Sequence, residues 1–377
     1  REWQDHFADE LEKMEFNRLK SDGNVYVHKH LHIIILAYVD DLMIFGELSH
    51  IKQLDDRMQK TFLIKRTGDL NDDGSEIKFL GRRIQRKDQG ILMYEDPEYY
   101  DEIFNELNMT HCKESPTPAA ATTPITDINE EELVDAEQHS LYRRIVGKLQ
   151  WQRLLRPDAA FTIKELARDL NAPTTQSFKR LKHLVRYLKG TLHYKLLLQP
   201  KLVMESMKDY DVTLVIPTDA NWAGCPKSRK STSGMLLEYL GTPIHFISRT
   251  QSVIAQSSAE SELYAIGSGV AEGLHVRSFL LEAGLVRNVT LEVQTDSSSA
   301  KSIAKQYGTS RKTRHIQLRY LFMQDLVRTD VLKITKIDGT QNPADVFTKF
   351  VKLDVLRRHL QRIGLVIDDH DEHRQLT

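Results

Sequence analysis

Residues 211–248 read DVTLVIPTDANWAGCPKSRKSTSGMLLEYLGTPIHFIS and carry the strongest fold signal in the chain. This stretch contains three successive strand-like runs, which are Val212–Pro217, Met235–Leu240 and Ile244–Ser248. Downstream, the pattern runs helix, strand, two helices, strand and a last helix. Three strands in succession followed by this alternation predict a mixed five-stranded sheet with flanking helices over residues 208–350.

Acidic side chains stand where these predicted strands and helices meet their loops. Asp219 follows the first strand, Asp296 follows the fourth, and Asp345 stands at the start of the last helix. On the helix after the third strand, Glu260 and Glu262 compete, because residues two apart lie about 200° around a helix and cannot both face one cleft. Glu260 completes an S-x-x-E capping pattern, so Glu262 is the acid predicted to face the sheet.

Four converging carboxylates predict a metal site. Like charges that are buried together repel and lose hydration, so such a cluster needs cations, and hard divalent ions such as Mg²⁺ suit oxygen ligands. Two such ions would activate a water molecule and stabilise the leaving oxygen in phosphodiester hydrolysis. Taken one at a time, each acid is better explained as an ordinary strand-end or N-cap residue, so the prediction rests on the combination of four acids with the strand order.

The composition limits the class of protein. The chain has 377 residues, 40% of them hydrophobic, which is enough for two or three globular domains and excludes a disordered tail. No apolar run approaches the roughly 18 residues of a membrane span, so no membrane partner is expected. Only two cysteines, Cys112 and Cys225, are present, which excludes a disulfide framework or a disulfide partner.

Charge is segregated along the chain. The 52 Lys and Arg residues oppose 53 Asp and Glu residues for a net charge of -1, which by itself argues against a nucleic-acid partner. By segment, however, the net charge is -14 over residues 1–138, +10 over 139–199 and +3 over 200–377. A basic block of this kind is the electrostatic footprint of phosphate binding, although a solvated helix face explains it as well.

The N-terminal part predicts strands around an acidic turn. Apolar, strand-like runs flank Asp40 and Asp41 on both sides, which places the two acids at the tip of a hairpin. The acidic segment 115–138 is rich in Pro and Thr and predicts a linker. Two basic amphipathic helices are expected to follow it, within residues 139–200.

Motifs along the chain resemble those of one known family. Five stretches resemble the ribonuclease H domain of copia-type LTR-retrotransposon polyproteins: TDANWAGCPKSRKSTSG (218–234), AQSSAESELYAI (255–266), TDSSSAKSIAKQ (295–306), SRKTRHIQLRYLFMQDLV (310–327) and NPADVFTK (342–349). Four upstream stretches are similar to the second half of that family's reverse transcriptase and its thumb or connection region: AYVDDLMIFG (37–46), KFLGRRI (78–84), YRRIVGKLQWQRLLRPD (142–158) and HLVRYLKGT (183–191). The resemblance covers roughly residues 1–350, with the motifs in the family's order.

The resemblance implies an α/β and α+β multidomain protein, a partial polymerase followed by a ribonuclease H-like domain. Its expected parts are a partial reverse-transcriptase palm with a YVDD hairpin (1–114), an acidic Pro-Thr linker (115–138), a basic helical thumb or connection region (139–200), a ribonuclease H-like domain (208–350) and a C-terminal helix and tail (351–377). The implied activity is cleavage of the RNA strand of RNA–DNA hybrids, which leaves 3′-hydroxyl ends.

The resemblance also implies metal ligands and partners. The expected cofactors are two Mg²⁺ or Mn²⁺ ions per active site. The implied ligands are Asp219, Glu262, Asp296 and Asp345 in the nuclease, and Asp40 and Asp41 in the polymerase part. Expected partners are an RNA–DNA hybrid, a template-primer, and other polyprotein parts such as integrase and the missing polymerase half. The implied location is intracellular, in a cytoplasmic particle or the nucleus.

A set of twelve side chains, eleven basic and one histidine, is predicted to hold nucleic acid. Such contacts to the sugar-phosphate backbone position a duplex without reading its sequence. The set is Lys227, Arg229, Lys230, Arg311, Lys312, Arg314, His315, Arg143, Arg144, Lys148, Lys182 and Arg186. His315 is explained equally well as a solvated histidine at a helix start.

The polymerase resemblance is incomplete. A polymerase of this family needs a carboxylate on an earlier palm strand, and none of the aspartates before Tyr38 follows an apolar strand. The first residue is Arg1, so we expect a piece of a longer protein that does not synthesise DNA alone. Two alternatives to an active ribonuclease H stay open: a decayed or co-opted element that binds nucleic acid without cutting it, and another nuclease or an integrase on the same fold.

Overall fold

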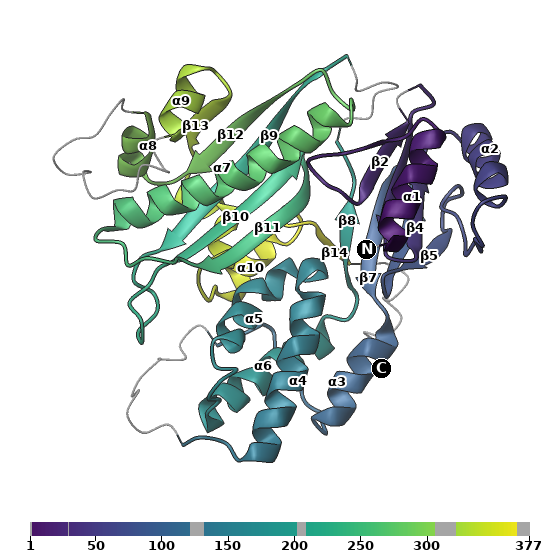
Figure 1. Cartoon of the computed structure of the whole chain (residues 1–377). Coiled ribbons are helices and arrows are strands. Elements are labelled where there is room, and N and C mark those ends of the chain that lie inside the picture. The colour runs from purple at the N-terminus through teal and green to yellow at the C-terminus, as the bar shows by residue number, and fades with distance from the viewer. Residues whose placement is uncertain (1, 29, 121–131, 202–208, 306–321, 368–377) are drawn as a thin grey trace.

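The computed structural model describes residues 2–28, 30–120, 132–201, 209–305 and 322–367. Three β-sheets organise these residues, one of four strands and two of five strands, and helices pack against them (Figure 1). The described chain is therefore a mixed α/β protein with several sheets, as the sequence predicts.

The C-terminal sheet is mixed. Its strands are β9 (Asp211–Asn221), β10 (Thr232–Tyr239), β11 (Thr242–Thr250), β12 (Asn288–Thr295) and β13 (Leu332–Lys336). They lie in the order β11-β10-β9-β12-β13. β10 is antiparallel to both of its neighbours, whereas β12 is parallel to β9 and to β13. The predicted mixed five-stranded sheet is thus present.

Helix α7 (Ser258–Glu282) connects β11 to β12 and covers one face of this sheet (Figure 1). Leu263, Ile266 and Val270 recur at helical spacing and are buried in the core between helix and sheet. Gly273 permits a close approach, because a Cβ atom there would lie 2.6 Å from Ile216 Cδ1 on β9. With 25 residues α7 is long, yet no helix in the described ranges combines the length and apolarity needed to cross a membrane.

The N-terminal sheet is an antiparallel meander beside two helices. Its elements are α1 (Glu2–Lys13), β1 (Asn17–Arg18), β2 (Val25–His28), β3 (Ile33–Tyr38), β4 (Asp41–Phe45) and α2 (Leu48–Met58). Phe7, Leu11 and Met58 from the helices pack against Ile33 and Ile35 of the sheet. β3 and β4 pair from Tyr38 and Asp41 outward, so the predicted acidic hairpin is present.

The third sheet joins segments that lie far apart in the chain. Its strands are β5 (Glu76–Phe79), β6 (Arg82–Lys87), β7 (Gly90–Glu95), β8 (Tyr194–Leu198) and β14 (Leu365–Ile367). All neighbouring pairs are antiparallel, in the order β14-β8-β7-β6-β5. Residues from the expected palm, the expected helical region and the C-terminal tail therefore share one sheet, and the parts expected from the sequence are structurally interlocked.

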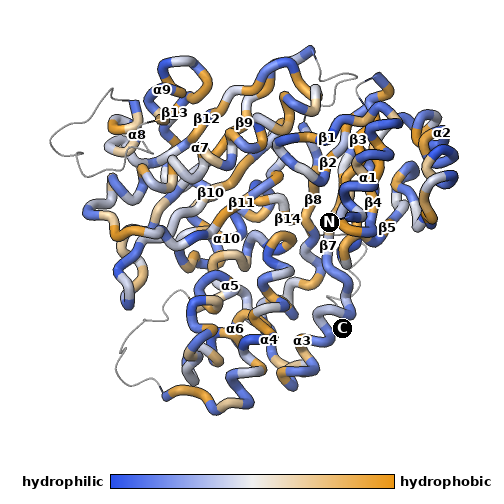
Figure 2. The backbone as a smooth tube through the Cα atoms, viewed as in Figure 1, coloured by the Kyte–Doolittle hydropathy of each residue, from blue (hydrophilic) through white to orange (hydrophobic). Residues whose placement is uncertain are grey.

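Helices between β7 and β8 form the lower part of the molecule in Figure 1. They are α3 (Pro97–Glu106), α4 (Ala136–Gln152), α5 (Ala160–Ala167) and α6 (Thr175–Gly190). Hydrophobic residues gather where these helices face one another (Figure 2), and their core continues into the C-terminal sheet through Leu236 and Phe347. Helix η6 (Pro343–Phe347) and helix α10 (Leu353–His359) then lead to β14. This helical region therefore supports the second face of the C-terminal sheet.

Candidate metal centre and nucleic-acid interface

Three acids from separate elements converge at one edge of the C-terminal sheet. Asp219 lies near the end of β9, Asp296 directly follows β12, and Glu262 lies in the first turns of α7. Because β9 and β12 are parallel neighbours, their carboxyl ends meet at the same edge of the sheet. Each of the three carboxylates offers an oxygen atom, and these atoms all lie within 4.8 Å of one another. We call these three residues the carboxylate cluster.

The carboxylate cluster is sheltered from solvent. Asp219 and Glu262 are 4% and 6% exposed, and Asp296 is partly buried. Burial raises the pKa of Glu262 to about 9, and the charges of Asp219 and Asp296 add to this rise. Burial likewise raises the pKa of Asp219 and of Asp296. Ionising all three groups together is therefore unfavourable, and a bound cation would relieve that cost.

The donor set fits a hard divalent cation. All three groups are carboxylates, the ligand type that suits Mg²⁺ and Mn²⁺. Glu262 Oε2 is buried and has no hydrogen-bond partner among the described residues, although buried polar atoms in proteins are normally paired. A buried, unpaired carboxylate oxygen beside two further carboxylates has the environment expected of a metal ligand.

The fourth predicted ligand, Asp345, lies in η6 beside the carboxylate cluster but outside the group of three mutually close oxygens. After burial, its charge contributes to the raised pKa of Asp219. Its Oδ1 atom lies 2.9 Å from Lys349 Nζ in an ion pair. The described structure thus brings three predicted ligands together and holds the fourth against a lysine.

Sequence reasoning missed two residues that contact these acids, Thr348 and Lys349. The Thr348 hydroxyl donates a hydrogen bond to the Asp219 carboxylate. Burial disfavours a charged Lys349, but Asp219 and Asp345 outweigh that effect and raise the pKa of its amine. Both residues belong to the quoted stretch NPADVFTK, and the four-residue spacing of Asp345 and Lys349 is the signal that identifies the pair.

Glu260, the competitor of Glu262, has a structural role at the start of α7. Its backbone N–H donates to Ser257 Oγ at 3.2 Å, and its Oε2 atom accepts a hydrogen bond from the backbone N–H of Gln256 at 2.7 Å. The Tyr264 hydroxyl also donates to its carboxylate. These bonds cap the helix, and the structure brings Glu262 to the two aspartates.

Asp40 and Asp41 have a different environment in the β3–β4 turn. Both residues are exposed. The preceding residue, Val39, has a φ of 52°, and its carbonyl accepts a hydrogen bond from Trp3 Nε1 at 2.9 Å. Within the described ranges, no further Asp, Glu, His or Cys side chain joins this pair to make a three-ligand group.

Three predicted nucleic-acid contacts lie together in the loop between β9 and β10, residues 222–231. Lys227 and Arg229 are exposed, and Lys230 is partly exposed. None of their side chains makes a hydrogen bond or an ion pair with another residue of the described structure. We call residues 222–231 the basic loop, because these three charges are available to a phosphate backbone.

The predicted nucleic-acid contacts on the basic helices differ in whether their side chains are already paired within the protein. Arg144 and Lys148 form ion pairs with Glu106 of α3, and Arg186 donates to the backbone carbonyl of Lys113. Their positive charge or hydrogen-bonding capacity is therefore partly used within the protein. Arg143 and Lys182 are exposed on α4 and α6.

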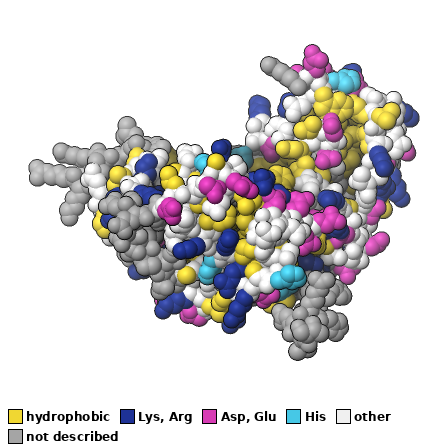
Figure 3. All heavy atoms as spheres, turned by 90° about the horizontal axis from the view of Figure 1, so that it is seen from below, with side chains coloured by type: hydrophobic (Ala, Val, Ile, Leu, Met, Phe, Trp, Pro, Cys, Tyr) yellow, Lys and Arg dark blue, Asp and Glu magenta, His cyan; other side chains and the backbone are white. Residues whose placement is uncertain are grey.

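The face viewed from below carries basic and acidic side chains intermixed (Figure 3). This mixture agrees with the pairing of the basic helices with acids of α3. The remaining predicted contacts lie outside the described residues, and they are Arg311, Lys312, Arg314 and His315.

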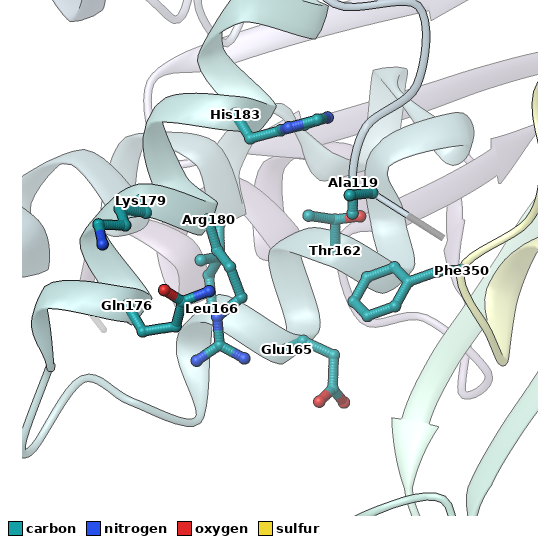
Figure 4. Close-up of a pocket in the computed structure, with 10 residues that line it drawn as sticks. Ala119, Thr162, Glu165, Leu166, Gln176, Lys179, Arg180, His183 and Phe350 are labelled. Carbon is teal, nitrogen blue, oxygen red and sulfur yellow. The ribbon is translucent and has the colours of Figure 1, made fainter. Parts of the chain in front are cut away.

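A cavity of about 140 Å³ lies between α5 and α6, with Glu165, Arg180, His183 and Phe350 around it (Figure 4). None of the twelve predicted contacts lines it. Small-molecule sites usually enclose about 300–1,000 Å³, so this cavity is too small for a typical ligand. Its acid, Glu165, is moreover already paired with Lys164.

Comparison with known proteins points to one family. Residues 1–121 match the family described as "Reverse transcriptase (RNA-dependent DNA polymerase)". The "Retrovirus-related Pol polyprotein from transposon TNT 1-94" of Nicotiana tabacum is 29% identical over 374 residues, which are 97% of this chain and 27% of that protein. The "Retrovirus-related Pol polyprotein from transposon RE2" of Arabidopsis thaliana is 27% identical over 350 residues, 92% of this chain and 23% of that protein.

The chain thus spans about a quarter of the length of these curated relatives. Among solved structures, a foamy viral protease-reverse transcriptase in complex with an RNA/DNA hybrid aligns over 81% of this chain and 36% of its own, with 16% identity and a TM-score of 0.45. The sequence matches extend over nearly the whole chain. Over most of its length the chain is therefore similar to the Pol polyproteins of copia-type retrotransposons, and residues 1–121 match the reverse transcriptase family.

Proposed function

We propose that this chain hydrolyses the RNA strand of RNA–DNA hybrids in the manner of ribonuclease H, next to a reverse-transcriptase domain. The observation that carries the proposal is the carboxylate cluster at the carboxyl ends of the parallel pair β9 and β12. Buried carboxylates at this place suit hydrolysis of a phosphodiester by bound divalent cations. We assign residues 208–350 to the nuclease, 1–114 to the palm and 139–200 to helices that hold the duplex.

Asp219, Glu262 and Asp296 would hold Mg²⁺ or Mn²⁺, with Asp345 as a further ligand. When bound, two such ions supply a water of lowered pKa and stabilise the charge that develops on the phosphate and on the leaving oxygen. The protein orients the ligands. Thr348 fixes the carboxylate of Asp219, and Asn342 Nδ2 donates to Thr218 O at 2.9 Å, which ties η6 to β9. Such supporting bonds hold ligands in a productive geometry.

Substrate binding in this proposal is electrostatic and depends on shape. The basic loop contacts phosphates, and such contacts fix the register of a duplex without reading bases. An RNA strand is distinguished by its 2′-hydroxyl groups. Asn221, two residues beyond Asp219 on β9, offers its amide oxygen for such a contact, while its Nδ2 atom donates to Thr348 O at 3.4 Å. The expected setting for this activity is a cytoplasmic particle or the nucleus, together with other parts of the polyprotein.

We propose that this 377-residue chain does not synthesise DNA by itself. Asp40 and Asp41 are exposed on a turn, and no third carboxylate joins them within the described residues. Two-metal nucleotidyl transfer needs several ligands that converge on both ions. A primer-extension assay on a primed RNA template with Mg²⁺ should yield no product, whereas extension of the primer by even a few nucleotides would refute this proposal.

The nuclease proposal is tested on a hybrid with an end-labelled RNA strand in the presence of Mg²⁺. We expect cleavage of the hybrid but not of an all-DNA duplex, and loss of cleavage in Asp219→Asn, a nearly isosteric change. Glu260→Gln is the matched control on the same helix, because the amide can still accept the bond from Gln256. Unchanged cleavage by Asp219→Asn would show that the metal-site assignment is wrong.

The same assay separates the proposal from the decayed or co-opted element considered above. A chain of that kind would retain the basic loop and would bind the hybrid, for example in a gel-shift experiment. It would release no RNA fragments with either Mg²⁺ or Mn²⁺. Binding of this kind without cleavage would replace the nuclease proposal with that alternative.

A further inference from the structure

The basic loop has a defined shape. The backbone N–H of Cys225 donates to Lys230 O at 3.1 Å, and the backbone N–H of Arg229 donates to Cys225 O at 2.7 Å. Arg229 and Ala223 adopt positive φ values of 54° and 49°, which non-glycine residues rarely do. These bonds close the loop on itself around Cys225, so its three charges are displayed from a turn.

A side chain from outside the C-terminal sheet anchors this turn. Arg168 follows the last residue of α5, and its Nη2 atom donates to Cys225 Sγ and lies 3.5 Å from Ser228 Oγ. The backbone N–H of Ser228 also donates to Cys225 Sγ, at 3.2 Å. Burial opposes it, but these hydrogen bonds from Ser228 and Arg168 lower the pKa of the Cys225 thiol. The sulfur atom is therefore the point at which α5 holds the loop.

A second contact from α5 holds the end of the same loop. The buried amine of Lys164 donates to Thr232 Oγ1 at 2.9 Å, and Thr232 is the first residue of β10. Glu165 lies between the two cations, because it pairs with Lys164 and, at 3.4 Å, with Arg168. The helical region thus fixes both the turn and the exit of the basic loop.

We propose that Arg168 is a positioning residue for nucleic-acid binding, which holds Lys227, Arg229 and Lys230 in place before a phosphate backbone arrives. This inference rests on the proposed function, since it takes the basic loop as a phosphate contact. Arg168 acts through the loop and does not touch the duplex. Three like charges in one short loop repel one another, so holding them in place costs free energy. When the loop is anchored, this ordering takes place during folding, and the free energy of binding no longer includes it.

The test is a double-mutant cycle on hybrid binding, measured by fluorescence anisotropy in EDTA so that cleavage plays no part. The first variant, Arg168→Gln, removes the anchor, and the second replaces Lys227, Arg229 and Lys230 with alanine. We expect Arg168→Gln to weaken binding about tenfold in the wild-type loop, the order of the cost of reordering a few side chains. In the alanine loop the same change should have almost no effect.

Salt dependence supplies an independent readout. Each lost phosphate contact lowers the slope of log K against log salt by about 0.9. The alanine loop and Arg168→Gln should both reduce the slope, whereas Arg57→Gln, the same chemical change on an exposed side chain of α2, should not. In cleavage assays Arg168→Gln should raise KM and leave kcat unchanged, and Arg168→Lys should recover part of the loss.

Two outcomes of the double-mutant cycle would each overturn the inference. If Arg168→Gln weakens binding equally in both loop backgrounds, Arg168 binds the duplex directly. If it weakens binding in neither, the anchor is irrelevant to binding. Cys225→Ala removes the sulfur atom that accepts the hydrogen bond from Arg168 and leaves α5 unchanged. It must weaken hybrid binding as Arg168→Gln does, and it serves as the test if Arg168→Gln folds poorly. Hybrid binding without cleavage would refute the nuclease proposal alone, whereas no binding by the wild type would refute both.

Discussion

The carboxylate cluster and the Asp40–Asp41 turn are both pairs or groups of acids next to apolar strands, but their surroundings differ. Asp219, Glu262 and Asp296 come from three elements, and two of them are almost completely buried. Asp40 and Asp41 are consecutive residues of one exposed turn. Water solvates the turn, whereas the buried acids can ionise together only with a counter-charge. Convergence and burial, and not the number of acids, therefore distinguish the candidate metal centre.

The largest expected effect is on cleavage. Glu262→Gln removes one ligand charge and keeps the shape of the side chain, so we expect hybrid cleavage to fall at least about a hundredfold, or ~2.7 kcal/mol in activation free energy. Asp41→Asn should change the same rate less than about twofold. Single-turnover cleavage of a labelled hybrid measures both variants, and equal losses in the two would show that the regions do not differ in function.

The pH dependence of stability gives the next largest effect. Burial raises the pKa of Glu262 from 4.5 to about 9, so the folded protein binds a proton at this site that the unfolded chain releases. The stability contributed by this group is complete below pH 4.5 and is lost as the pH rises toward 9. In EDTA, the melting temperature should therefore fall across this range in the wild type and fall less in Glu262→Gln. A similar fall in both proteins would exclude Glu262 as the cause.

Lys349 places a positive charge beside the acids of the candidate metal centre. Its ammonium lies 2.9 Å from Asp345, and its side chain is 45% exposed, so solvent screening limits the pair to about 1 kcal/mol. We expect Lys349→Met to destabilise the metal-free protein by that amount and Mg²⁺ to restore most of the loss. Thermal melts with and without Mg²⁺ measure it. A loss that Mg²⁺ leaves unchanged would mean that Lys349 stabilises through packing alone.

The smallest effect concerns the exposed turn. Asp40→Asn and Asp41→Asn remove charges that water already solvates, so the free energy of unfolding should change by less than about 0.5 kcal/mol. Urea denaturation followed by circular dichroism measures this value. Destabilisation by more than 1 kcal/mol would show that the turn is constrained in a way that its exposure does not reveal.

The sequence predicted the C-terminal sheet and its acids because the signals are local. Apolar runs of strand length give the strands, and the acids stand directly after those runs. The choice between Glu260 and Glu262 followed from helix geometry and a capping pattern. In the structure Glu260 caps α7, and Glu262 lies beside the two aspartates.

Contacts between segments that lie far apart in the chain could not be predicted from the sequence. The third sheet pairs β7 with β8 and β8 with β14, which are separated by about a hundred residues or more, and no local pattern encodes such pairing. The anchor of the basic loop depends on Arg168, more than fifty residues away from Cys225. The ion pairs of Arg144 and Lys148 with Glu106 are also non-local, so a charge count overstated the basic surface.

The assignment of the metal centre is tested most directly by the stabilisation of the protein by divalent cations without any substrate. A ligand that binds only the folded state raises its stability, by about 2.7 kcal/mol at a hundred times its Kd. We expect Mg²⁺ or Mn²⁺ to raise the melting temperature of the wild type and of Asp41→Asn, and we expect Asp219→Asn to lose this increase. An equal increase in Asp219→Asn, or loss of the increase in Asp41→Asn, would contradict the assignment of the metal centre to the carboxylate cluster.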